Sequence, residues 1–200
     1  MKRSQAILGF AVGVLVLAVL YFGIYPALFP RSIAAQLRAG GVSTPLNAFT
    51  LKSVDMRKAS SVSVTNVDAE SSGTQLHLEI TQGMEEKLAE LYLEEEKVGI
   101  ESLFVAQPAH YPGVITREVD CSAEFQPEKG TVGDTAYYIM YANERFSYGI
   151  CAQDLAKYRS VVGLLYCKNR KTFVETKLFF PIETFDKDQA LGLLKSFQCI

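Results

Sequence analysis

The sequence lacks the short motifs from which most catalytic and metal-binding functions are inferred. It contains no recognisable catalytic or nucleotide-binding motif, and none of its four cysteines is spaced as C-x-x-C. That spacing argues against thioredoxin-like redox chemistry and against zinc-ribbon ligation. Only His77 and His110 are available to complete a mixed cysteine–histidine metal site. We therefore expect no metal, no cofactor and no enzymatic activity.

The chain also has no excess of positive charge and no glycosylation sequon. The net charge is −2, and no basic stripe with interleaved aromatic residues occurs, so nothing indicates a nucleic-acid partner. No Asn-x-Ser/Thr sequon is present, which favours a bacterial periplasm or a similar unglycosylated compartment. The sequence does not indicate any particular small-molecule ligand.

A long apolar segment lies near the start of the chain. Ala6–Phe29 is apolar except for Gly, Tyr and Pro, and it follows a short basic N-terminus, residues 1–5. At a rise of about 1.5 Å per residue, a helix over this segment reaches about 36 Å, enough to cross a hydrocarbon core of roughly 30 Å. We therefore predict a single transmembrane helix over 6–29. A cleaved signal peptide is the alternative, because Ser32–Ala34 offers small residues for cleavage.

Two features of this anchor bear on its environment. Gly9 and Gly13 form a GxxxG pair, which lets a second helix approach closely and so favours a membrane-protein partner. Glycine is also simply common in membrane helices, which is the alternative explanation. Lysine and arginine are nearly balanced at the two ends of the anchor, so they do not decide its orientation. Cysteine usage favours a cytoplasmic N-terminus with the remaining chain in the periplasm or an equivalent space.

The remaining chain predicts an α+β domain over 48–200, with an antiparallel sheet packed by helices, including a C-terminal helix. Residues 30–47 are expected to form a juxtamembrane segment, with a short helix over Arg31–Ala39 and a linker over Val42–Asn47. Met84–Lys97 and Asp186–Phe197 are predicted helices, the first with Met84, Leu88, Leu91 and Tyr92 on its apolar face. The predicted strands are Ser61–Val67, Gln75–Thr81, Ser102–Ala106, Val114–Val119, Thr135–Ala142, Arg145–Ala152, Ser160–Lys168 and Thr172–Phe180.

The cysteines form an even set, which predicts two structural disulfides in an oxidising compartment. Reduced core cysteines in a cytosolic domain are the alternative. Cys167 lies at the turn end of the predicted hairpin that Asn169–Arg170 closes, and the final helix runs back towards that turn. It should cover the strand face of Val174 and Leu178, because Glu175 and Lys177 point away. We therefore predict Cys167–Cys199, which leaves Cys121–Cys151.

Several groups of side chains are candidates for a binding or catalytic site. Lys168, Arg170 and Lys171 gather at a hairpin turn and form a candidate contact for a partner, for phosphate or for anionic lipid, unless they only keep the turn soluble. The glutamates of the first helix indicate a solvated face or a contact with a basic partner. Tyr137, Tyr138, Tyr141 and Tyr148 suit either sheet packing or a binding surface. A nucleophile formed by Cys121 and His110 is disfavoured, because neighbouring Asp120 would raise the pKa of the thiol.

These observations favour a non-enzymatic, membrane-anchored accessory subunit or assembly factor of a membrane-protein complex. Such a protein acts through contacts of its anchor and its extracytoplasmic domain. A tethered ligand-binding or sensing domain is the alternative, and a deep pocket between sheet and helix would favour it. A hydrolase or thiol enzyme is disfavoured by the lack of a catalytic constellation.

Overall fold

A computed structural model describes residues 33–35, 37–38, 41–102, 127–142 and 156–200. In this part of the chain no helix combines the length and the apolar character that a bilayer crossing requires. The predicted anchor over 6–29, with Gly9 and Gly13, lies outside the described residues. So do the predicted strands Val114–Val119 and Arg145–Ala152.

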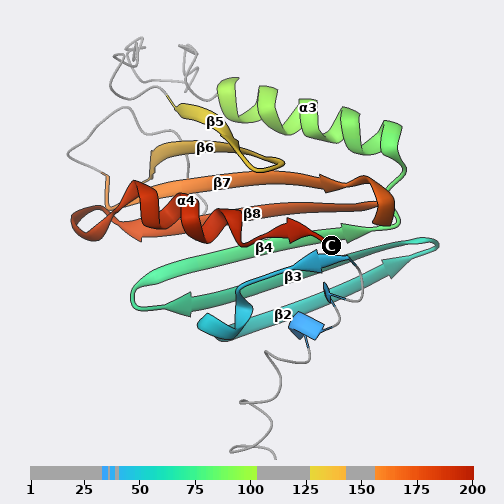
Figure 1. Ribbon diagram of the computed structural model, residues 1–200, viewed down its shortest axis with the longest axis horizontal. Helices are drawn as coiled ribbons and strands as arrows, with labels where there is room; N and C mark the ends of the chain where they lie inside the picture. Colours follow the sequence, from blue (N-terminus) through green and yellow to red (C-terminus); the bar gives the residue numbers. More distant parts are fainter. Residues whose placement is uncertain (1–32, 36, 39–40, 103–126, 143–155) are drawn as a thin grey trace, which may run out of the picture.

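A seven-stranded antiparallel sheet forms the centre of the domain, in the order β2-β3-β4-β8-β7-β6-β5 (Figure 1). Neighbours along the chain pair directly within β2–β4 and within β5–β8, and β4 joins the two groups by pairing with β8. The strands are β2 (Thr50–Ala59), β3 (Val62–Ser71), β4 (Thr74–Gln82), β5 (Glu128–Val132), β6 (Thr135–Ala142), β7 (Tyr158–Cys167) and β8 (Thr172–Pro181). The prediction of an antiparallel α+β domain is thus confirmed.

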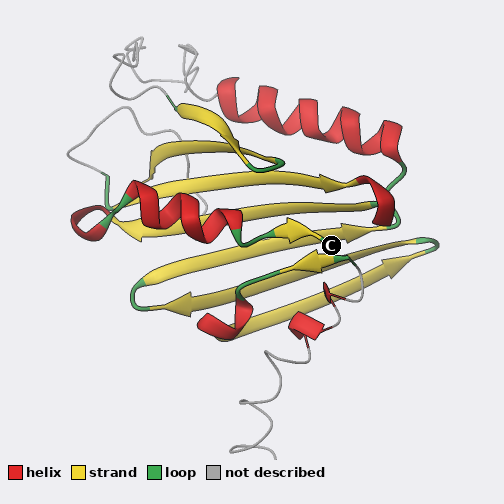
Figure 2. Cartoon of the chain, viewed as in Figure 1, coloured by secondary structure: helices red, strands yellow, loops and turns green. Residues whose placement is uncertain are grey.

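Helices cover both faces of this sheet (Figure 2). Helix α4 (Lys187–Lys195) lies on one face, where Ala190 and Leu194 pack with Val174 and Leu178 in a buried cluster. Its start is fixed by Asp186, whose side chain accepts a hydrogen bond from the Gln189 amide at 2.9 Å. Helix α3 (Glu86–Ser102) covers part of the opposite face. The predicted burial of Val174 and Leu178 beneath the C-terminal helix is correct.

The predicted disulfide between Cys167 and Cys199 is present, with a Cα–Cα distance of 5.3 Å. It ties a second, two-stranded sheet of β1 (Val42–Ser43) and β9 (Gln198–Cys199) to the end of β7. Val42 pairs with Cys199, and the Ile200 amide donates a hydrogen bond to the Gly41 carbonyl at 2.9 Å. The bridge therefore fastens both the C-terminus and the start of the domain. The predicted Cys121–Cys151 bridge lies outside the described residues.

The segment predicted as a linker, Val42–Asn47, is part of the folded domain. Val42 and Leu46 are fully buried, and a 3-10 turn, η2 (Leu46–Ala48), leads into β2. The prediction was wrong because Gly, Ser, Thr and Pro suggested a loop, whereas the two apolar side chains between them fill the core. Ile33 and Leu37, just before it, are buried in the same cluster.

Other boundaries differ from the predictions in ways that have local causes. Helix α3 continues to Ser102, so the predicted strand Ser102–Ala106 does not begin there; the rest of it lies outside the described residues. The turn between β7 and β8 is a 3-10 turn, η5 (Lys168–Arg170), rather than a two-residue turn. Lys171, not Asn169, takes the left-handed conformation, with a φ of 49°. Cys167 still pairs with Thr172, as predicted.

Candidate functional site

Helix α3 packs on the sheet through a small, tightly packed set of side chains. Ala89 and Ile100 are buried, and Tyr92 and Leu93 pack beside them against the strands. The Tyr92 ring meets the Phe173 ring edge-on, with centroids 5.1 Å apart and an interplanar angle of 89°. Ala89 has the smallest side chain of the set and allows the helix to approach the sheet closely.

The predicted buried face of α3 is correct for Met84 and Tyr92, which pack against the sheet, but wrong for two leucines. Leu88 and Leu91 were predicted to lie on the buried side, but they are 54% and 62% exposed, and Val98 is 65% exposed. Two apolar stripes fit the helical period in this segment, one through Ala89 and Ile100 and the other through Leu88 and Leu91. The stripe that packs inward is the one that carries the alanine and an aromatic ring.

The exposed stripe has the spacing of a helix–helix contact. Leu88, Leu91, Glu95 and Val98, hereafter the α3 ridge, follow one another at intervals of three, four and three residues. This is the spacing at which one helix presents side chains to the grooves of a second helix. Glu95 interrupts an otherwise apolar ridge at its centre. The ridge therefore offers apolar surface with a single negative charge inside it.

The charges around the ridge are strongly negative. Helix α3 carries six glutamates and two lysines. Glu94 pairs with Lys97, and the residues at the start of the helix pair with the β7–β8 turn, through Glu86 with Lys168 and through Glu85 with Lys171. Within the described chain, neither Glu90 nor Glu95 has an ion-pair partner. The outward side of α3 thus carries more carboxylates than cations, with exposed Lys87 and the nearby Lys168 offsetting only part of the negative charge.

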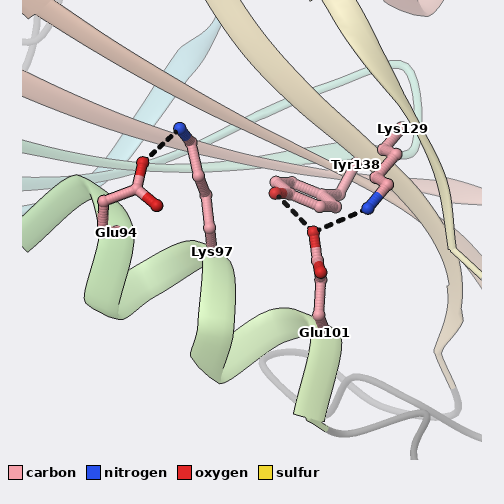
Figure 3. A network of polar contacts seen from close by, with 5 residues as sticks. All are labelled: Glu94, Lys97, Glu101, Lys129 and Tyr138. Carbon is pink, nitrogen blue, oxygen red and sulfur yellow. Dashed lines mark hydrogen bonds and ion pairs between the residues drawn. The ribbon is translucent and has the colours of Figure 1, made fainter.

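The far end of α3 is fixed to the sheet by a polar network (Figure 3). Glu101 accepts a hydrogen bond from Lys129 at 2.9 Å and another from the Tyr138 hydroxyl at 3.3 Å. Burial and the neighbouring Glu101 carboxylate raise the pKa of Tyr138 to about 12. The hydrogen bond from Lys129 lowers the pKa of Glu101. These contacts join α3 to β5 and β6 and keep its outward face in one orientation.

A buried carboxylate lies on the same face of the sheet, beside α3. Glu175 is 4% exposed and pairs with Lys177, whose Nζ is 2.8 Å from its Oε1. Burial raises the pKa of Glu175, which Lys177 only partly offsets. Burial also raises the pKa of Tyr92 to about 12, with further contributions from Glu96 and other carboxylates. The sequence prediction placed Glu175 correctly away from α4, on the face that α3 partly covers.

A small cavity over β2, β3 and β4 contains the polar groups that most resemble a catalytic site. Ser53 donates a hydrogen bond to Asp68 at 2.5 Å, and the same carboxylate contacts Nδ1 of His77 at 2.8 Å. Asp68 thus lies between the serine and the histidine, so the imidazole does not contact the hydroxyl as it does in a serine nucleophile activated by histidine. Gln75, which also lines the cavity, has a buried Oε1 without a hydrogen-bond partner in the described part of the chain. The cavity volume is about 160 Å³.

The remaining predicted residues are placed as follows. Lys168, Arg170 and Lys171 are exposed at the β7–β8 turn. Tyr138 is buried, and Tyr141 stacks on Arg159, whose Cζ lies 4.0 Å from the ring centroid. Among the described residues, no group of His, Cys, Asp and Glu side chains is arranged to hold a metal ion. His110, Cys121, Cys151 and Tyr148 lie outside the described residues.

Comparisons with known proteins give no further guide to this site, because no family model, no curated protein and no solved structure matches the chain.

Proposed function

We propose that this chain is a non-enzymatic, membrane-anchored accessory subunit or assembly factor that binds a membrane-protein partner through the α3 ridge. The observation that carries this proposal is the exposure of Leu88, Leu91 and Val98 along one helix. Scattered surface leucines need no explanation, but apolar side chains aligned along one rigid helix, interrupted here only by Glu95, are typical of an interaction site. The same helix is fixed to the sheet by its buried face and by the network at Glu101.

The charges of α3 define the chemistry of the partner. A second copy of this chain would bring two helices of strongly negative charge together, which is unfavourable. A partner helix with apolar side chains and a lysine or arginine opposite Glu95 would bury the apolar ridge and neutralise its central carboxylate. We therefore infer a basic amphipathic helix as the occupant, bound in the helix-against-helix manner. Basic side chains at the rim would also meet Glu90.

The proposed location rests on the anchor and on the disulfide. The predicted transmembrane helix over 6–29, with the GxxxG pair of Gly9 and Gly13, would hold the chain in the membrane beside its partner. The Cys167–Cys199 bridge supports an oxidising compartment for the domain, which is the periplasm or its equivalent. The N-terminus would then be cytoplasmic.

Features of the polar cavity favour this function over the two alternatives. Small-molecule sites usually enclose about 300–1,000 Å³, whereas the polar cavity over β2–β4 measures about 160 Å³. A larger hollow of about 330 Å³ beside Tyr141, Arg159 and Phe185 is open to solvent and does not lie between sheet and α3. Its Ser53–Asp68–His77 arrangement lacks the serine–histidine contact that a hydrolase needs. The α3 ridge, in contrast, has a spacing and a charge pattern that suit a protein partner.

The test is a charge placed in the ridge. Leu91→Glu is compared with Met56→Glu, because Met56 is 59% exposed and lies on β2, away from α3. After gentle detergent extraction, we expect a stoichiometric membrane partner to co-purify with the unmodified chain and with Met56→Glu, and to be lost from Leu91→Glu. Glu95→Lys should weaken the same association, and a lysine-to-glutamate exchange in the partner helix should restore it. Equal recovery of the partner with both glutamate variants would refute the proposal.

A further inference from the structure

One end of the sheet brings together cations that are distant in the sequence. Lys58 pairs with Ser63 at this end of β2 and β3, and Cys167 pairs with Thr172 at the same end of β7 and β8. Gln82 of β4 pairs with both Ser63 and Thr172, so these pairs form one row across the sheet. Figure 1 shows the β2–β3 turn, the β7–β8 turn and the start of α3 on this side of the domain.

Three of the cations at this end have no carboxylate partner within the described chain: Arg38, Lys58 and Arg170. All of them are exposed. The Arg170 side chain packs directly against Gly41, at the start of the described domain. A Cβ added to Gly41 would lie 2.1 Å from the Cγ of Arg170.

Three ion pairs also lie at this end, and Lys87 and Glu90, at the start of α3, add one exposed charge of each sign. Lys168 and Lys171 contact Glu86 and Glu85, and Arg57 contacts Asp55 at 2.7 Å. Within each of these three ion pairs the positive and the negative charge cancel. The end is therefore positive, although the whole chain has a net charge of −2.

The length of chain between the predicted anchor and the domain places this end near the bilayer. The anchor ends at Phe29, and Ile33 is already buried in the domain. A chain extends by at most about 3.6 Å per residue, so the four steps between them span no more than about 14 Å. Ile33 and Lys58 line the same surface cavity, of about 250 Å³. Lys58 must then lie close to the lipid headgroups.

We propose that this basic end, defined by Arg38, Lys58 and Arg170, rests on anionic lipid headgroups of the leaflet from which the anchor emerges. The inference rests on the membrane anchor of the proposed function. Basic residues near a charged membrane surface are attracted within about one Debye length, which is about 8 Å at physiological salt. The contact would hold the domain in one orientation on the bilayer, with α3 presented at a fixed height to its partner.

The test uses the absence of tryptophan from the chain. Asn169→Trp places a single donor in the β7–β8 turn, and Glu183→Trp places a matched donor beyond the opposite end of β8. The full chain is incorporated into lipid nanodiscs that carry a dansyl headgroup acceptor, either in phosphatidylcholine alone or with about 30% phosphatidylglycerol. We expect energy transfer from the Asn169→Trp donor to rise with phosphatidylglycerol and to fall back in about 1 M salt. Transfer from the Glu183→Trp donor should not rise.

A charge-reversed pair identifies the residues responsible. Lys58→Glu with Arg170→Glu is compared with Lys52→Glu plus Lys157→Glu, which changes the net charge equally at other exposed positions. Each basic residue contributes a factor of about five, so the first pair should lower the ratio of docked to undocked domain by at least about 25-fold. The second pair should leave the lipid-dependent rise in place.

Three outcomes would overturn the inference. Transfer that is equal in both lipids, while the chain incorporates normally, would refute lipid docking and leave the anchor and the α3 proposal intact. A rise with phosphatidylglycerol that persists in about 1 M salt would show that the contact is not an electrostatic one made by the basic end. Failure of the full chain to incorporate into nanodiscs would overturn both the lipid contact and the membrane-anchored function.

Discussion

Removing the Cys167–Cys199 bridge should destabilise the domain by about 4 kcal/mol. The two cysteines are separated by 32 residues in the sequence. For a closed loop of that length, the loss of chain entropy in the unfolded state corresponds to roughly 4 kcal/mol at 25 °C. The perturbation is the double variant Cys167→Ala with Cys199→Ala. Reduction of the unmodified protein is a second comparison, since it leaves both sulfur atoms in the structure but would also break the predicted Cys121–Cys151 bridge.

Without the bridge, protection from hydrogen exchange should be lost first in the two-stranded sheet of β1 and β9. Strands β1 and β9 contain two residues each, too few to remain paired without the bridge. The Ile200 amide, bonded to the Gly41 carbonyl, should therefore lose its protection from hydrogen exchange. Amides of β8, in the centre of the sheet, should keep most of theirs under the same conditions.

The assay is urea-induced unfolding of the full chain at a fixed detergent concentration, followed by far-UV circular dichroism, with hydrogen exchange measured in parallel. The predicted result is a lower midpoint equivalent to about 4 kcal/mol, with a slightly steeper slope, because the unfolded chain without the bridge is less compact and exposes more surface. A loss below about 1 kcal/mol would show that the bridge does not constrain the unfolded chain as reasoned. Equal loss of protection in β8 and at Ile200 would contradict the local role of the bridge.

Three further perturbations test other parts of the account. Tyr92 and Tyr138 should ionise near pH 12 instead of 10, so the absorbance of the protein at high pH should show late tyrosine ionisation that phenylalanine substitutions remove. The free energy of unfolding should fall as pH rises from 10 to 12, because these tyrosines ionise first in the unfolded chain. Ionisation of both near pH 10 would contradict their burial beside α3. Leu194→Ala should cost about 2–5 kcal/mol in urea unfolding, because Leu194 is fully buried beneath α4, and a cost under 1 kcal/mol would place α4 outside the core. Gly41→Ala should lower the melting temperature, because Gly41 has a φ of 87° and the new Cβ would meet Arg170; an unchanged melting temperature would show that this approach is not tight.

The centre of the fold could be predicted from alternating strands and turn residues. Thr135–Ala142 has the same boundaries in the structure as in the prediction, and the β7–β8 hairpin fixed the Cys167–Cys199 pairing through its register. Strand β2 was missed, because it is an edge strand whose mostly exposed, charged residues do not alternate clearly. Strand β5 was missed for the same reason, since Glu128–Val132 is short and mostly exposed.

The candidate site was only partly predictable. The glutamate-rich helix was recognised, and Met84 and Tyr92 were placed correctly on its packed side, but Leu88 and Leu91 were not, since both apolar stripes satisfy the helical period. The choice between them depends on the sheet surface that α3 meets, where Phe173 receives the ring of Tyr92. Because this surface comes from distant strands, the local sequence does not contain it. The gathering of Arg38, Lys58 and Arg170 at one end depends in the same way on strand register.

The most direct test of the proposed function is a photo-reactive side chain introduced at Leu91 of the full chain in its native membrane. The same group at Gly192 is the matched control, because Gly192 lies on α4 and has open space for a side chain. We expect one discrete adduct from position 91, linked to a basic amphipathic helix of a membrane protein, and none from position 192. Glu95→Lys should abolish that adduct. The same adducts from both positions, or none from position 91, would contradict a partner bound at the α3 ridge.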